Sequence, residues 1–310
     1  MRVVVALGGN ALLQRGQPLE ASIQQANVAR AARAIVQLAA SDEVVVTHGN
    51  GPQVGLLALQ SEAYSAVHPY PLDVLGAESE GMIGYLLAQG LHNAGLERQA
   101  VSVLTRVQVD AQDPAFTYPT KPVGPLFTRV EADRLAVERR WTIAPDGPGY
   151  RRVVPSPDPL AIVEIQAIRV LVAAGFLVIC TGGGGIPTAV ASDGVDRGVE
   201  AVVDKDLAAA LLARDLEADA LLMLTDVPAV MAGWDTPEAT PIRRVRVPAL
   251  RQRRFAPGSM GPKVEAACRF VEATGGIAGI GSLDDGARIL TGEAGTMILP
   301  DVAATRMATG

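Results

Sequence analysis

Lysine is almost absent from this sequence. The chain has 310 residues, of which 27 are Lys or Arg, and only Lys121, Lys205 and Lys263 are lysines. Lysine is normally among the commonest residues of a globular protein, so arginine supplies nearly all of the positive charge here. A chain that uses arginine almost everywhere is expected to keep lysine where arginine cannot replace it. The three positions are therefore candidate functional residues.

Cysteine is also scarce, which limits the redox chemistry of the chain. There are two cysteines, Cys180 and Cys268, and they are not arranged as a Cys-x-x-Cys pair. This excludes a disulfide framework and gives no sign of a zinc or dithiol site. The starting sequence MRVVVALGGN carries one positive charge, and Gly8 and Gly9 interrupt its apolar run too early for a signal peptide. We therefore expect a cytoplasmic protein with both cysteines reduced in its core.

The chain has no excess of positive charge and no uninterrupted long hydrophobic run. Its net charge of −6 argues against nucleic acid as a main partner, because a phosphate backbone requires a basic surface. The longest uncharged stretch, residues 170–192, is interrupted by Gly175, by four consecutive glycines and by Pro187. We interpret it as a helix end, a strand and a turn, and expect no membrane-spanning segment.

Short apolar runs alternate with helical periodicity along most of the chain, which predicts an α/β fold with a mainly parallel sheet. Ser22 and Gln25 resemble a capping box that opens a helix ending near Ala40. Pro52 in HGNGP is placed for the first turn of a helix. We predict strands at 3–7, 44–47, 99–105, 176–181, 220–225 and 277–280, and further helices at 74–92, 159–174, 207–216 and 261–274.

Residues 107 to about 156 break this alternation. Eight prolines lie between Pro114 and Pro157, and hydrophobic periodicity is poor except near a short helix at 131–140. We predict an inserted small lid subdomain rather than a linker, since it contains aromatic residues with which to build a core: Tyr118, Phe127, Trp141 and Tyr150.

Three predicted strands end in glycine-rich turns, at Gly8-Gly9-Asn10, Gly49-Asn50-Gly51 and Gly182–Gly185. Ligands of open α/β sheets bind beyond the carboxyl ends of the strands. Glycine lets backbone N–H groups approach an anion closely, and a following helix N-terminus favours negative charge. A single glycine motif of this kind can equally be a tight turn with no ligand. Three such motifs at predicted strand ends favour a site for several phosphate oxygens.

Neither common nucleotide motif is present. No lysine stands in the Gly-Lys-Ser/Thr context of a Walker A loop. Gly49-Asn-Gly51 is followed by Gly55, one residue too late for a dinucleotide-binding G-x-G-x-x-G, and the third turn continues to Pro187. A kinase fold outside both families fits better.

Each lysine lies in a segment of special chemistry. Lys121 is in PTKPVGP of the predicted lid, Lys205 lies between Asp204 and Asp206, and Lys263 follows GSMGP at a helix start. Lysine is a compact, mobile point charge that can follow a phosphoryl group, whereas arginine imposes one planar geometry. Phosphoryl transfer depends on such charge neutralisation and positioning. We expect Asp204 to take part in the chemistry, by orienting the lysines or holding Mg²⁺ through water, and Asp206 to cap a helix.

No general base is evident. His68 and His92 lie near predicted helix ends, and His48 is placed to shape the turn before Gly49. No Ser/His/Asp grouping and no metal-ligand spacing of histidines occurs. This pattern suits an acceptor that is already anionic, such as a carboxylate oxygen.

Several long motifs resemble those of the bacterial carbamate kinases, a branch of the amino acid kinase superfamily. They extend from about residue 2 to residue 298 and are VVALGGNAL, VVTHGNGPQVGLLALQ, ESEGMIGYLL, DPAFTYPTKPVGP, RRVVPSPDP, ICTGGGGIP, GVEAVVDKDLAAALLA, LTDV and GSMGPKVEAACRFVEATGG. The resemblance implies a homodimer of αβα sandwiches around an open, mainly parallel eight-stranded sheet. It also implies the reaction ATP + carbamate ⇌ ADP + carbamoyl phosphate with Mg²⁺, in fermentative arginine or related catabolism.

The resemblance further implies two lobes and a role for each candidate residue. Residues 1–165, with the lid, would bind carbamate or carbamoyl phosphate, and residues 166–310 would bind ATP or ADP. Lys121, Lys205 and Lys263 would neutralise the phosphates, with Asp204 organising the lysines. Around the transferring phosphoryl group it places Gly8, Gly9, Asn10, Gly49, Asn50 and Gly51, and near the nucleotide Gly182, Gly183, Asp226 and Met260.

One position separates this branch from its relatives. Many superfamily members carry lysine two residues before the Gly-Gly turn, where this chain has Ala6. This difference disfavours acetylglutamate kinase, glutamate kinase and aspartokinase. Two alternatives stay open: a carbamoyl-phosphate-forming or other acylphosphate kinase of the same fold, and a nucleotide-binding sensor that has lost catalysis.

Overall fold

A central sheet of eight strands organises the chain, and its strand order is β15–β17–β16–β12–β1–β2–β9–β3. The computed structural model describes residues 1–14, 16–64, 66–234, 236, 238–256, 258 and 260–301. Neighbouring strands run parallel except for the antiparallel pair β16 and β17. The strands are β1 (Arg2–Leu7), β2 (Glu43–His48), β3 (Ala100–Ser102), β9 (Leu177–Ile179), β12 (Ala220–Thr225), β15 (Arg244–Arg246), β16 (Ile277–Ser282) and β17 (Thr296–Leu299).

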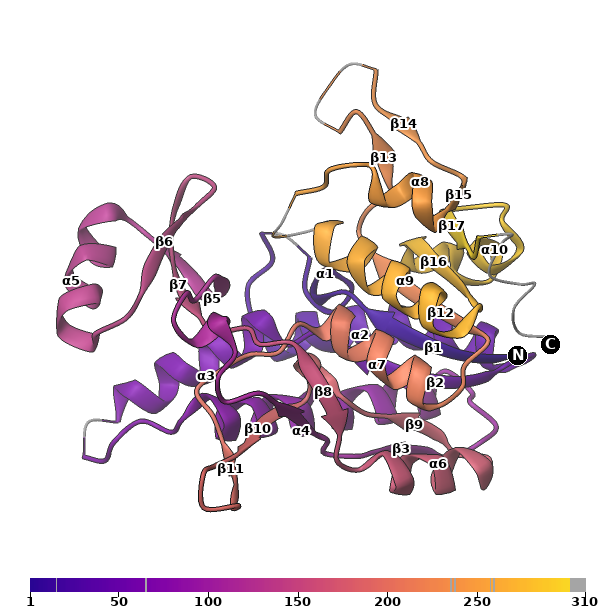
Figure 1. Cartoon of the computed structure of the whole chain (residues 1–310). Helices are drawn as coiled ribbons and strands as arrows, with labels where there is room; N and C mark the ends of the chain where they lie inside the picture. The colour runs from indigo at the N-terminus through magenta and orange to yellow at the C-terminus, as the bar shows by residue number, and fades with distance from the viewer. Residues whose placement is uncertain are drawn as a thin grey trace.

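Helices cover both faces of this sheet. Strand β1 directs Val3, Val5 and Leu7 into one hydrophobic core and Val4 and Ala6 into the other, as the two-residue period of a strand requires. The first core contains α2 (Ala21–Ala39), α4 (Leu72–Asn93) and α10 (Gly286–Thr291). The second contains α6 (Ile165–Ala173), α7 (Lys205–Asp215), α8 (Val247–Arg251) and α9 (Met260–Thr274). The predicted αβα sandwich with a mainly parallel eight-stranded sheet is therefore confirmed (Figure 1).

The proline-rich segment divides between two smaller sheets. Residues 121–154 form an antiparallel sheet with order β5–β7–β6 that carries helix α5 (Arg129–Arg139) and projects from the main body above α3 (Gly51–Ala63) (Figure 1). Its strands are β5 (Lys121–Phe127), β6 (Ile143–Asp146) and β7 (Gly149–Val154). We call these residues, 121–154, the lid. The start of the segment instead joins a four-stranded sheet of β4 (Arg106–Val109), β8 (Pro159–Ile162), β10 (Ile186–Val190) and β11 (Asp196–Gly198).

Aromatic and arginine side chains pack the lid. The ring centroids of Phe127 and Trp141 lie 6.3 Å apart, and the Arg152 guanidinium stacks over Trp141 at 4.7 Å. Arg129 lies over the ring of Tyr150 at 5.2 Å. Tyr118, in contrast, is 73% exposed, so the expectation that it packs inside this subdomain was wrong.

Most predicted elements are present, with local shifts. The predicted strands at 220–225 and 277–280 correspond to β12 and β16, and those at 99–105 and 176–181 are shortened to β3 and β9. The helix predicted from residue 159 was wrong in its first part, because Pro159–Ile162 form β8 and pair with β4, and α6 begins at Ile165. The capping box at Ser22 does not form, since α2 begins at Ala21 and its N-cap is Glu20.

The uncharged stretch at 170–192 is confirmed as a helix end, a strand and a turn. It contains the end of α6, strand β9, the 3₁₀ turn η2 (Gly182–Gly184) and all of β10, a second strand that was not predicted. Among the described residues, the helices are all too short or too polar to span a membrane.

Candidate active site

The site begins at the carboxyl ends of the three central strands β12, β1 and β2. The turn after β1 is bound to β12, since the Gly8 N–H donates to the Leu224 carbonyl oxygen at 2.7 Å. The turn after β2 is bound to β1, since the Gly49 N–H donates to the Leu7 carbonyl oxygen at 3.0 Å. Two of the predicted glycine turns therefore lie side by side, where ligands of open α/β sheets bind. Gly9 begins the short helix α1 (Gly9–Leu12), and the Asn10 side chain lies outside the described part of the structure.

The third glycine turn packs against the second. Gly183 has a left-handed backbone (φ 69°), and a Cβ atom there would lie 2.1 Å from Asn50 Nδ2. Only glycine allows both the conformation and this close approach. Asn50 is buried, and its amide Nδ2 donates to Ser79 Oγ at 2.7 Å. The turns after β2 and β9 thus form one continuous wall.

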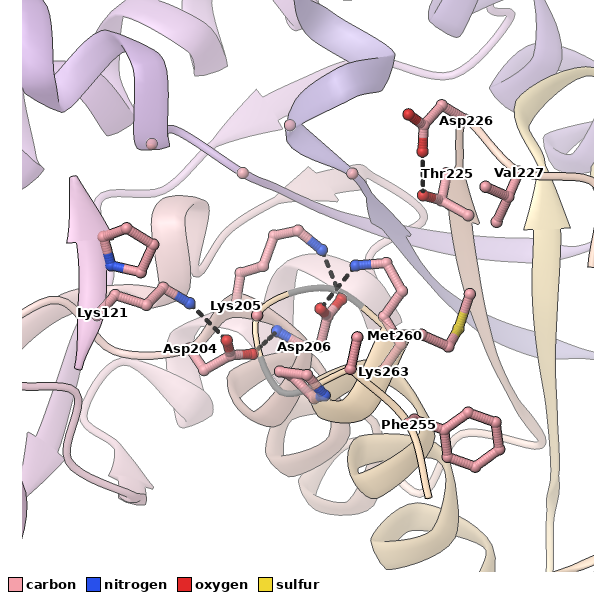
Figure 2. Close-up of a pocket in the computed structure, with 18 of the residues that line it drawn as sticks. Lys121, Asp204, Lys205, Asp206, Thr225, Asp226, Val227, Phe255, Met260 and Lys263 are labelled. Carbon is pink, nitrogen blue, oxygen red and sulfur yellow. Dashed lines mark hydrogen bonds and ion pairs between the residues drawn. The ribbon is translucent and has the colours of Figure 1, made fainter. Parts of the chain in front are cut away.

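The lid supplies the first lysine. Lys121 begins β5, and its Nζ atom lies 2.5 Å from Asp204 Oδ2, at the start of α7 (Figure 2). Gly55 of α3 supports this placement, because a Cβ atom at Gly55 would lie 2.2 Å from the Gly124 Cα atom of β5. The lid therefore lies directly on α3, with Lys121 directed at the main body.

The other two lysines converge on one carboxylate. Lys205 Nζ lies 2.5 Å from Asp206 Oδ1, and Lys263 Nζ, from the first turn of α9, lies 3.0 Å from Asp206 Oδ2 (Figure 2). The starts of α7 and α9 therefore place two cations on either side of one anion. Helix N-termini repel cations but attract anions, so the arrangement suits phosphates bound between the lysines.

Burial and neighbouring charge act in opposite directions on this cluster. Burial lowers the pKa of Lys205, and the nearby Lys263 lowers it further, although Asp206 counteracts both. Burial also disfavours the charged form of Lys263, but the Asp206 carboxylate outweighs it and raises the pKa of Lys263. Burial would raise the pKa of Asp206, yet the two lysines hold that pKa well below its usual range. Asp206 is therefore ionised at neutral pH.

The roles expected for the two aspartates are partly exchanged. Asp204 is the N-cap of α7, and its Oδ1 atom accepts from the Asp206 N–H at 2.9 Å. The prediction that Asp206 caps the helix was therefore wrong. Asp204 also contacts Lys121, while Asp206 contacts Lys205 and Lys263. The exchange has a local cause. The side chain of an N-cap residue accepts a hydrogen bond from the N–H two or three residues later. Because α7 begins at Lys205, Asp204 is the N-cap and can accept from the Asp206 N–H.

The lysines and glycine turns line one cavity of about 620 Å³. Thr225 and Asp226, which follow β12, and Met260 of α9 line its other side, where Thr225 Oγ1 donates to Asp226 Oδ1 at 3.1 Å. Of the predicted glycines, Gly182 is buried and does not line the cavity. The sequence did not single out three lining residues, Trp234, Arg254 and Phe255, although the scarcity of aromatic residues was an available signal.

This arrangement defines a class of site. Three cations from three separate elements line, together with the glycine turns, a cavity large enough for a nucleotide and a small acceptor. In the part of the chain that the structure describes, no three His, Cys, Asp or Glu side chains cluster as metal ligands. The geometry is that of a phosphate-binding site suited to phosphoryl transfer between small molecules.

Comparison with known proteins agrees with this class. The model of the amino acid kinase family matches residues 1–280, and the chain belongs to that family. It is 53% identical to the carbamate kinase of Rhizobium meliloti over 96% of this chain and 93% of the relative. It is 52% identical to the carbamate kinase of Haemophilus influenzae, over 96% of each chain.

A solved structure extends the comparison to three dimensions. The carbamate kinase from Giardia lamblia bound to AMP-PNP is 42% identical, with a TM-score of 0.88 over 97% of this chain and 98% of that chain. The isopentenyl phosphate kinase of T. acidophilum is only 16% identical, at a TM-score of 0.55, and shares the fold alone. The predicted resemblance to the carbamate kinases of this family is confirmed.

Proposed function

We propose that this chain transfers a phosphoryl group reversibly between ATP and carbamate, with ADP and carbamoyl phosphate as the other pair. The observation that carries the proposal is the meeting of Lys121, Lys205 and Lys263 at one cavity between the glycine turns. Close relatives that are carbamate kinases, with identities near 50% over nearly the full length, support the choice of acceptor.

The geometry suggests how the work is divided. In this proposal the turns after β1 and β2, together with Lys121, hold the acceptor and the transferring phosphoryl group. Lys205 and Lys263 then neutralise the charge on the nucleotide phosphates while the phosphoryl group moves between donor and acceptor. Asp226 and Met260 line the side of the cavity where we place the nucleotide. In this division, residues 1–165 bind the acceptor and residues 166–310 bind the nucleotide.

The acceptor needs no protein base. A carbamate oxygen is already anionic, so no proton has to leave before it attacks phosphorus. No histidine among the described residues lines the cavity, and burial lowers the pKa of His48, beside the lining residue Gly49, to about 4. The chemistry therefore rests on positioning and charge neutralisation.

We also propose that Mg²⁺ enters with the nucleotide. Its preferred ligands are phosphate oxygens, water and one or two carboxylates, and Asp204, Asp206 and Asp226 line the cavity within reach of such a complex. The ion supplies further charge neutralisation on the phosphates. The same family resemblance supports a cytoplasmic homodimer acting in arginine or related catabolism.

The proposal is tested by the synthesis of ATP from ADP and carbamoyl phosphate, coupled to hexokinase and glucose-6-phosphate dehydrogenase. We expect robust turnover that Lys205→Ala or Lys263→Ala lowers by at least about 100-fold, because each removes a cation from a site of low dielectric. Acetyl phosphate and glutamyl phosphate serve as competing donors. Absence of ATP from carbamoyl phosphate, with good turnover on another acylphosphate, would show that the acceptor is wrong.

A further inference from the structure

Helix α4 places two consecutive polar side chains beneath the glycine turns. Ser79 is 0% exposed and Glu80 is 1% exposed, although both lie on a helix that otherwise buries apolar residues. A buried carboxyl group without a neighbouring cation is costly. Neither residue lines the cavity, so the function described above does not account for them.

Both oxygens of Glu80 accept hydrogen bonds from backbone groups on different elements. Oε1 accepts from the Gly182 N–H at 2.7 Å, and Oε2 accepts from the Thr105 N–H at 3.2 Å. Gly182 begins the turn after β9, and Thr105 lies between β3 and β4. The carboxyl group therefore joins the two chain segments that leave one edge of the central sheet.

The turn that Glu80 holds is strained and tightly seated. Thr181 has a left-handed backbone (φ 50°), which a β-branched residue rarely adopts without support from its surroundings. A Cβ atom at Gly182 would lie 2.4 Å from His48 Nε2 and 2.9 Å from Glu80 Cγ. The turn thus rests directly on Glu80 and on His48, whose Nδ1 atom lies 3.2 Å from the Gly49 carbonyl oxygen.

The next part of the turn is fixed by the neighbouring residue of α4. Ser79 accepts from Asn50 Nδ2 and donates to the Gly76 carbonyl oxygen at 2.8 Å, which fixes the direction of the Asn50 amide. Asn50 in turn is the side chain against which Gly183 packs. Ser79 and Glu80 therefore hold both sides of the wall formed by the turns after β2 and β9.

The protonation state of Glu80 matters to an anion above it. Burial raises the pKa of Glu80 to about 8, although the N–H groups of Thr105 and Gly182 favour its ionised form. The titratable groups that face it are His48 from the end of β2, Cys180 from the end of β9 and Glu164 from the start of α6. At neutral pH the carboxyl is mainly neutral, so it adds no negative charge beneath the phosphates.

We propose that Glu80 is a positioning residue, which holds the Gly182 turn in place for nucleotide phosphates through its two backbone hydrogen bonds. The proposal rests on the function proposed above. Glu80 touches no ligand and acts through the turn alone. Ionisation of Glu80 in alkaline solution places a negative charge under the turn and weakens phosphate binding.

The test compares Glu80→Gln with Glu78→Gln, the same substitution at an exposed position of the same helix. Glutamine retains the length of the side chain, but it can accept only one of the two backbone N–H groups. We expect kcat/KM for ADP to fall about 10- to 100-fold at pH 7, since the turn shifts relative to the reacting atoms. Amide hydrogen exchange of the peptide containing Gly182 should accelerate. Glu78→Gln should match the wild type in both measurements.

The pH profile separates positioning from simple structural support. In the wild type, KM for ADP should rise several-fold between pH 7 and pH 9.5, as the infrared carbonyl band of a protonated buried carboxyl disappears. In Glu80→Gln this band should be absent. The rise in KM that coincides with the loss of the band in the wild type should then be absent as well. Any rise in KM caused by deprotonation of Lys205 at alkaline pH is the same in the wild type and in Glu80→Gln.

Several results would overturn the proposal: a wild-type kcat/KM, exchange rate and pH profile in Glu80→Gln, or equal effects of Glu78→Gln. If Glu80→Gln does not fold, the wild type decides, because loss of the infrared band without a change in KM contradicts the proposal. Hydrogen exchange and calorimetric binding of ADP do not involve the acceptor. They test Glu80 even if carbamoyl phosphate proves not to be a substrate.

Discussion

Asp206 lies between Lys205, its neighbour at the start of α7, and Lys263 of α9, which lies 57 residues further along the chain. Lys205 and Lys263 each contact one of its oxygens, so both ammonium groups are held near the cavity. A guanidinium in place of either lysine is larger and forms two parallel bonds to a carboxylate. The geometry explains why a chain with 24 arginines among its 27 basic residues retains lysine here.

Asp206→Asn should destabilise the protein strongly. The substitution leaves two buried ammonium groups beside each other without their carboxylate, and removing one partner of a buried ion cluster costs about 3–5 kcal/mol. The folded state holds the pKa of Asp206 below its unfolded value. Its stabilisation is therefore present above the unfolded pKa and is lost as pH falls through the folded pKa. Urea unfolding should show the full difference at pH 7 and a smaller one at pH 3.

The matched control for this prediction is Asp193→Asn. Asp193 forms an exposed pair with Arg197 at 2.7 Å, and exposed pairs contribute about 0–1 kcal/mol. Its loss should change the free energy of unfolding by less than about 0.5 kcal/mol. Equal effects of the two substitutions would contradict the special role of Asp206.

Lys121→Arg should lower kcat much more than it weakens nucleotide binding. Lys121 contacts Asp204 from the lid, and the larger, planar guanidinium of arginine cannot occupy the same space as its ammonium group. Single-turnover kinetics and ADP titration would separate the two effects. Arg134→Lys, at an exposed position of α5 in the same lid, should leave kcat unchanged. Unaltered turnover in Lys121→Arg would contradict the role proposed for the Lys121 charge in phosphoryl transfer.

At the scale of elements, the contact between α3 and β5 sets the position of the lid. Gly55 and Gly124 touch through their backbones, and no side chain fits between them. An ion pair between Arg139 and Glu62 at 3.3 Å adds a second contact between the lid and α3. Because Lys121 lies three residues before Gly124 on the same strand, this contact decides where its charge lies.

Gly55→Ala should therefore reduce kcat by at least about tenfold, since a shift of about 1 Å in a catalytic group has large effects. The new Cβ atom would lie 2.2 Å from the Gly124 Cα atom, so the lid must move away from α3. Gly76→Ala is the control, because a Cβ atom there meets nothing within 4 Å. It should raise the free energy of unfolding by about 0.5–1 kcal/mol and leave kcat unchanged. Activity measurements and thermal melts check both outcomes.

Elements with a strong local pattern were predictable from the sequence, and elements that depend on a distant partner were not. Strands β1 and β12 are uninterrupted apolar runs, and both were predicted within one residue of their observed bounds. Pro159–Ile162 was predicted as helix because a short apolar run has no period of its own. It forms β8 only because β4 is available to pair with it.

The candidate site shows the same division. Glycine after an apolar run is a local signal, so the three turns could be found in the sequence and are observed together. The pairing of Lys263 with Asp206 and the burial of Glu80 beneath Gly182 carry no local signal. They depend on which helices the sheet order brings side by side.

On the scale of the whole molecule, the cavity is assembled from parts that are distant in sequence. The lid, the central strand ends and the starts of α7 and α9 each contribute to its lining. Two loops on the far side, around Trp234 and Phe255, complete it. A ligand that bridges these parts is expected to stabilise the folded state as a whole.

ADP should therefore raise the melting temperature. At an ADP concentration 100 times Kd, binding contributes about 2.7 kcal/mol, which corresponds to a shift of about 5 °C for a chain of this size. Lys263→Ala should reduce the shift at the same ADP concentration, and AMP, which lacks the second phosphate, should give a smaller one. Equal shifts of the melting temperature with ADP and AMP in differential scanning fluorimetry would show that the second phosphate of ADP does not bind at the lysines.

The α/β class, the three glycine turns, the short list of lysines and the resemblance to one kinase family could all be predicted from the sequence. These follow from local patterns, since strand periodicity, turn chemistry and composition are properties of neighbouring residues. The folded structure was needed to show which aspartate caps α7, which one contacts two lysines, and that Glu80 hydrogen-bonds the Gly182 turn. Such assignments require the distances between segments that are remote in the chain. They also depend on burial, which strengthens the electrostatic contacts and exists only after the sheet and its helices have packed.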